Sequence, residues 1–173
     1  MKYKKCFNIP NFLTLVRLIF IIPIVYSIAS NYYYIAILFF ILSNITDKLD
    51  GYIARKTKTE TVLGGYFDFI SDLATINAII ISLFIVGQTG KLNLFLTIAA
   101  TTALIAITII ISLKAKQFCM PHRFSIKILF VIITVGFYCH FLQLPYADIF
   151  LTLAVTPILG YTITDYIIYI IQT

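Results

Sequence analysis

Long apolar segments follow one another along this chain, and only short polar connections separate them. Hydrophobic residues make up 61% of the 173 positions and charged residues 12%, whereas about a quarter of the residues in an ordinary soluble domain are charged. A helix of roughly 20 apolar residues is long enough to cross a bilayer. The sequence therefore predicts an all-α integral membrane protein. Because no soluble module or linker interrupts it, we expect a single domain over residues 1–173.

Six helices are predicted from the apolar segments and the turn signals between them. The second apolar run, residues 32–45, is short of the roughly 20 residues that span a bilayer. That helix must therefore continue through the polar residues that follow it. The expected transmembrane helices are residues 12–30, 32–55, 65–86, 92–113, 124–144 and 147–171.

Basic residues are concentrated in the connections on one side of the predicted bundle, while the opposite connections contain only Lys91. Connections rich in Lys and Arg stay in the cytosol, so both chain ends are expected on the cytosolic side. The expected location of the protein is a bacterial cytoplasmic membrane. Topology and anionic lipid headgroups account for these charges, so membrane lipids are expected partners and nucleic acid is not. The basic set comprises Lys2, Lys4, Lys5, Arg55, Lys56, Lys58, Lys114, Lys116, Arg123 and Lys127.

Four aspartates lie within residues 47–72, where the second and third predicted helices meet. A carboxylate near hydrocarbon is costly unless it is paired, hydrated or bound to a metal, so acids placed there indicate a functional site. Asp68 and Asp72, four residues apart, share one face of the third helix. Spacings of three, four and seven likewise place a second group within a sector of roughly 60° on the preceding helix, namely Asp47, Asp50, Gly51 and Ala54.

The short connection between these two helices lets their acidic faces meet. Carboxylates that converge on one cavity cannot all stay ionised without cations. Hard oxygen ligands suit Mg²⁺ or Mn²⁺ rather than zinc or copper. The sequence therefore predicts a polar, metal-binding cavity near the cytosolic side of the membrane.

The acidic stretch also fits a known pattern, DxxDGxxAR, then eight residues, then GxxxDxxxD. It resembles the signature of the CDP-alcohol phosphatidyltransferases. The resemblance implies six transmembrane helices, a cytosolic active site and a homodimer. It also implies that the metal ligands are Asp47, Asp50, Asp68 and Asp72.

The same resemblance suggests roles for other motif positions. Asp72 would also take the proton of the attacking hydroxyl, as general base. The small residues Gly51, Ala54 and Gly64 match positions that the cytidine nucleotide approaches closely, although small residues at such spacing also serve helix packing. Arg55 lies beside the acidic face, where it either contacts the diphosphate or marks the cytosolic boundary.

Residues 8–17, NIPNFLTLVR, are similar to the opening of the phosphatidylglycerophosphate and cardiolipin synthases within this family. Arg17 would then either extend to the lipid headgroups or bind phosphate. Arg123 and Lys127 are four residues apart in the fifth predicted helix and are candidates to bind the phosphate of an acceptor. Extension to the headgroups explains them equally well.

The expected reaction is transfer of a phosphatidyl group from CDP-diacylglycerol to an alcohol, with release of CMP. Glycerol 3-phosphate is the first expected acceptor, and phosphatidylglycerol, inositol phosphate and serine are alternatives. The acceptor is less constrained than the chemistry, because Phe69 and Leu73 stand where phosphatidylglycerophosphate synthases usually have proline and lysine. Only Lys127 matches the glycine and two lysines that usually open their fifth helix.

Two other classes of protein are disfavoured. A divalent-cation carrier is expected to have two duplicated halves, with paired acids near the centre of the bilayer. This chain has one acidic cluster, which lies near one face of the membrane, and no second copy of it. A catalytically inactive scaffold is expected to have lost a motif acid, and none is missing.

Overall fold

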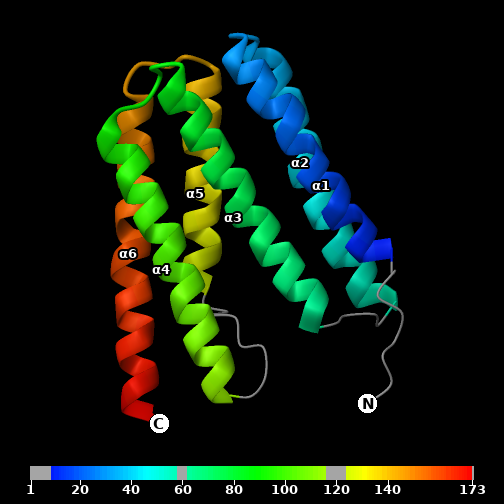
Figure 1. Ribbon diagram of the computed structural model, residues 1–173, viewed down its shortest axis with the longest axis vertical. Helices are drawn as coiled ribbons and strands as arrows, with labels where there is room; N and C mark the ends of the chain where they lie inside the picture. Colours follow the sequence, from blue (N-terminus) through cyan, green and yellow to red (C-terminus); the bar gives the residue numbers. More distant parts are fainter. Residues whose placement is uncertain (1–8, 58–61, 116–123, 173) are drawn as a thin grey trace. The chain divides into compact units, whose positions relative to one another are not determined.

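The structure is a computed structural model that describes residues 9–57, 62–115 and 124–172. Within these ranges every regular element is an α-helix, which confirms the all-α prediction. Each helix agrees with its predicted range to within a few residues (Figure 1). The helices are α1 (Ile9–Ala29), α2 (Tyr33–Thr57), α3 (Val62–Ile85), α4 (Lys91–Ala115), α5 (Phe124–Phe141) and α6 (Ala147–Gln172).

The chain divides between Ser82 and Leu83 into two compact units. The first unit contains α1, α2 and most of α3, and the second contains the last residues of α3 together with α4, α5 and α6.

In the first unit, α1 and α2 pack side by side as a helical hairpin (Figure 1). The turn between them depends on Asn31, whose φ of 59° is one that asparagine adopts more readily than most residues. The amide of Tyr32 donates to the carbonyl of Ser27 at 2.8 Å, and that of Asn31 donates to the carbonyl of Ile28 at 3.0 Å. These two bonds form a Schellman motif, which satisfies the last carbonyls of α1 and reverses the chain.

The helix α2 continues without interruption to Thr57, so it runs through the acidic motif as predicted. Its apolar half packs on α1, where Ala36 and Phe40 are buried together with Ile24 and Ile28 of α1. The polar half carries Asp47 about two turns beyond Phe40. The α1–α2 contact therefore fixes the helix that presents this carboxylate.

In the second unit, the hairpin turns after α3 and α5 are built like the turn after α1. Gly87, with φ 77°, and Gln143, with φ 53°, take the left-handed position. The amide of Gln88 donates to Leu83 at 2.8 Å, and that of Leu144 donates to Cys139 at 3.0 Å. The helices α1, α3 and α5 thus each end in a short, hydrogen-bonded reversal.

The helix α6 packs against both α4 and α5. On the α5 side the backbone of Gly136 approaches Leu151 so closely that an added Cβ would lie 3.2 Å from its Cδ1. On the α4 side the buried amide of Asn93 donates to Asp148 Oδ1 at 2.8 Å, and its carbonyl accepts from Thr152 at 2.6 Å. Thr89 donates to the same Asp148 oxygen at 2.6 Å. This polar cluster joins the start of α4 to the first turns of α6.

Two helical segments of the described residues are long and apolar enough to cross a membrane, Gly64–Ile85 and Lys91–Ile110. Three shorter apolar segments lie within α1, α5 and α6, namely Thr14–Ala29, Val131–Phe141 and Ala147–Pro157. Two of the six predicted spans therefore meet the length and composition test, and the other four stay predictions.

Candidate active site

Arg17 lies in the middle of α1, in an otherwise apolar stretch, and its side chain is only 2% exposed. A buried guanidinium is costly unless it is paired with negative charge. The guanidinium of Arg17 donates from Nη2 to Asp47 Oδ1 at 2.5 Å and to Asp68 Oδ1 at 2.7 Å. From Nη1 it donates to Asp72 Oδ1 at 2.5 Å. One side chain of α1 therefore links carboxylates on α2 and α3.

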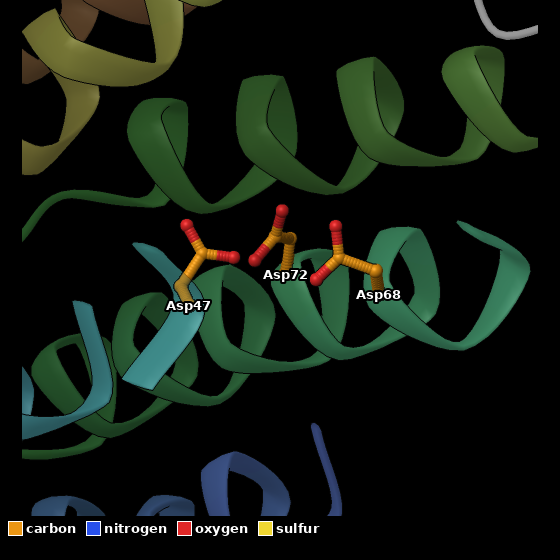
Figure 2. Close-up of side chains that lie close together, drawn as sticks. All are labelled: Asp47, Asp68 and Asp72. Carbon is orange, nitrogen blue, oxygen red and sulfur yellow. The ribbon is translucent and has the colours of Figure 1, made fainter. Parts of the chain in front are cut away.

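The three carboxyl groups come from two helices and converge, Asp47 from α2 and Asp68 and Asp72 from one face of α3 (Figure 2). One oxygen of each lies within 4.8 Å of one oxygen of the others. Their side chains remain 37–40% exposed, so small molecules can reach them while Arg17 is buried beneath. The predicted meeting of the two acidic faces is present in the structure.

The composition of this cluster suits a metal ion. Among the described residues of the cluster, three carboxylates share one cation, which leaves a net negative charge that favours binding of a divalent cation. All three potential ligands are carboxylate oxygens, the donors that Mg²⁺ and similar hard cations prefer. The guanidinium nitrogen Nη2 of Arg17 already lies between two of these oxygens. The residues present therefore fit a divalent cation.

The structure describes the positions of only some of the other predicted site residues. Ala54 and Gly64 are half-buried and lie on the same helix faces as Asp47 and Asp68, seven and four residues away, respectively. The remaining predictions lie outside the described residues or concern side chains that the structure does not describe. They are Asp50, Gly51, Arg55, Arg123 and Lys127, and the same holds for His122 and Asp165.

The role of Arg17 in this cluster was not predicted from the sequence. The two interpretations considered for it were extension to the headgroups and binding of phosphate. Its side chain instead points inward to three carboxylates. The available signal was a single basic residue within an apolar helix, in a chain whose next two helices carry four aspartates. Such a residue is as good a candidate for an internal ion pair as for the membrane surface.

Comparisons with known proteins identify the family of this chain. The family model described as CDP-alcohol phosphatidyltransferase matches residues 7–160. A Rickettsia felis protein named CDP-diacylglycerol--glycerol-3-phosphate 3-phosphatidyltransferase is 33% identical over 135 residues, which cover 70% of this chain and 74% of the relative. Relatives of the same name come from Rickettsia typhi, 31% identical over 70% of this chain and 75% of the relative, and Haemophilus influenzae, 39% identical over 43% and 42%. The chain therefore belongs to the CDP-alcohol phosphatidyltransferase family.

Proposed function

We propose that this protein transfers the phosphatidyl group of CDP-diacylglycerol to glycerol 3-phosphate, forming phosphatidylglycerophosphate and releasing CMP. The donor and the acceptor are those in the printed names of the relatives from Rickettsia and Haemophilus. The observation that carries the proposal is the convergence of Asp47, Asp68 and Asp72 on one point, with carboxylate oxygens within 4.8 Å.

The chemistry requires an acceptor oxygen to attack the phosphorus that bears the diacylglycerol, while the bond from that phosphorus to the oxygen of CMP breaks. The hydroxyl proton must pass to a base, and we assign this task to Asp72. The proposed metal ligands are Asp47, Asp50, Asp68 and Asp72, and the ion is Mg²⁺ or Mn²⁺. When bound, a divalent cation would neutralise the diphosphate and polarise the phosphorus under attack.

The substrates are proposed to bind around these carboxylates. Gly51, Ala54, Arg55 and Gly64 would contact the CDP group, and the half-buried positions of Ala54 and Gly64 on the carboxylate-bearing faces support this. Arg123 and Lys127 are proposed to bind the phosphate of the acceptor, for which two cationic side chains are suited.

We further propose that all six helices span a bacterial cytoplasmic membrane, with the active site and both ends in the cytosol. The short hairpin reversals after α1, α3 and α5 are consistent with alternating spans. We propose a single domain, because the family model extends across the boundary between the two units. A homodimer is also proposed, from the family resemblance alone.

The test is release of CMP by the detergent-purified protein from CDP-diacylglycerol and Mn²⁺. Parallel reactions contain glycerol 3-phosphate, phosphatidylglycerol, inositol phosphate or serine. We expect release with glycerol 3-phosphate only, and none in EDTA or with Asp68→Asn. The matched control is Asp148→Asn, the same chemical change in the polar cluster of α4 and α6, which should retain activity. Release with another acceptor would revise the product, and no release with any of them would contradict the proposal.

A further inference from the structure

The guanidinium of Arg17 binds three of the four carboxylates that the proposed function assigns to a metal ion. We propose that Arg17 is the resident cation of the metal-free site, that a divalent cation displaces it from Asp47, Asp68 and Asp72, and that the displaced guanidinium then pairs with phosphate of the bound nucleotide. The inference rests on the proposed function for the identity of that phosphate. Its first half, the displacement, rests on geometry alone.

The geometry concerns one nitrogen and two oxygens. Nη2 of Arg17 lies 2.5 Å from Asp47 Oδ1 and 2.7 Å from Asp68 Oδ1. Mg²⁺ and Mn²⁺ prefer oxygen donors, so an ion held by both of these oxygens would lie between them, as Nη2 does. Two cations cannot share that position. Binding of the ion through these oxygens therefore requires the guanidinium to leave.

The burial of Arg17 restricts where its charge can go. The side chain is 2% exposed, so the guanidinium cannot simply turn into water, and without an anion it would be an unpaired buried charge. The group that arrives with the metal is an anionic diphosphate, and a guanidinium binds phosphate oxygens as readily as carboxylate oxygens. Exchange of one anion for the other keeps the charge paired. It also frees Asp72 Oδ1, which accepts from Nη1 in the metal-free site.

The alternative is a cation that uses the other oxygen of each carboxylate while Arg17 stays in place. The two arrangements predict opposite effects of removing Arg17. If Arg17 competes with the ion, its removal strengthens metal binding. If it holds the carboxylates in position for the ion, its removal weakens metal binding.

The experiment measures Mn²⁺ binding to metal-free, detergent-purified protein without substrate, from the electron paramagnetic resonance signal of free Mn²⁺. We expect Arg17→Met to bind Mn²⁺ about tenfold more tightly than the unchanged protein, within the usual range of coupling between two ligands. The matched control is Lys48→Met, which removes the same charge from an exposed side chain adjacent to Asp47 in sequence. It should change the affinity by less than about twofold, since exposed charges are screened.

The second measurement is binding of CDP at saturating Mn²⁺. Arg17→Met should bind CDP about tenfold more weakly, because a charge-assisted hydrogen bond to phosphate is lost. Tighter metal binding together with weaker nucleotide binding is a signature that a purely structural arginine would not give. Unchanged CDP binding overturns transfer of Arg17 to phosphate, and unchanged or weaker Mn²⁺ binding overturns displacement.

Arg17→Met leaves three carboxylates without their cation, so it is also followed by circular dichroism with and without Mn²⁺. Folding that depends on Mn²⁺ supports the proposal. If the variant does not fold in either condition, Arg17→Lys decides, because an ammonium contacts fewer carboxylates than a guanidinium. It should bind Mn²⁺ more tightly than the unchanged protein, and equal or weaker binding overturns displacement. None of these measurements requires turnover, so an inactive protein with the expected Mn²⁺ affinities would refute the proposed function and leave the displacement standing.

Discussion

Nη1 of Arg17 and Oδ1 of Asp72 are 2.5 Å apart, although the two residues are separated by 55 positions in the sequence. The bond joins the middle of α1 to the third turn of α3. The same guanidinium also binds Asp47 of α2, so one side chain links three helices. The acidic site is therefore a product of tertiary packing and not of the motif alone.

Asp72→Asn tests the assignment of the general base. The amide retains an oxygen that can accept from Arg17, so folding and CDP binding should be largely preserved. Turnover should fall by about a hundredfold to ten-thousandfold, the usual contribution of a positioned base. Initial rates of CMP release and CDP binding at saturating Mn²⁺ provide the two readouts. Complete loss of CDP binding would instead identify Asp72 chiefly as a metal ligand.

Metal removal and replacement test the hard-oxygen character of the site. EDTA should abolish CMP release, and Mg²⁺ or Mn²⁺ should restore it, because the three described ligands are carboxylates. Zinc at equal concentration should restore it poorly, since it favours nitrogen and sulfur ligands in tetrahedral sites. Activity that persists through chelation and dialysis would contradict the metal assignment.

The close contact of α5 and α6 can be tested with two glycine variants. Gly136→Ala places a Cβ 3.2 Å from Leu151 Cδ1, and Leu151 is fully buried, so the helices must separate slightly. We expect a loss of about 1 kcal/mol in unfolding free energy after the gain in helix propensity is included. Gly160→Ala meets nothing within 4 Å and should be neutral or stabilising. Thermal unfolding in detergent compares the two, and equal midpoints would show that the contact accommodates a methyl group.

The polar cluster of α4 and α6 should contribute stability and not catalysis. Asn93→Ala removes the donor to Asp148 and the acceptor of Thr152 from a position that is 3% exposed. Each lost intramolecular hydrogen bond costs about 0.5–1.5 kcal/mol, so the thermal midpoint should fall while Mn²⁺ affinity is unchanged. Thr102→Ala, exposed on the same helix and bonded only within it, should have little effect. A change in Mn²⁺ affinity in Asn93→Ala would contradict the assignment of this cluster to stability alone.

The helices were predictable because their signals are local. Apolar runs of helical length and the turn residues Asn31 and Gly87 determine where α1 and α3 end, and the structure agrees. The continuation of α2 through the motif followed from length alone, since its apolar run was too short to span a bilayer. The facing of Asp47 toward Asp68 followed from residue spacing and a short connection.

The partners of Arg17 were not predictable in the same way. Periodicity indicates which face of α1 the residue occupies, but not which helix packs on that face. Its three bonds span 30, 51 and 55 positions, so they depend on how α1, α2 and α3 pack together. A lone arginine in an apolar helix is compatible with headgroups, substrate or internal acids, and only the packing decides among them.

The hairpin reversals after α1, α3 and α5 have a consequence for biogenesis. Each is closed by bonds between residues no more than five positions apart, centred on Asn31, Gly87 and Gln143. Such contacts can form as soon as their segment leaves the ribosome, so the proposed six spans would enter a bilayer as successive pairs. Arg17 and Asp47 arrive with the first pair, and Asp68 and Asp72 with the second. In the proposed six-span arrangement, the nascent chain would carry Arg17 into the membrane together with Asp47 and Asp50, before Asp68 and Asp72 are made.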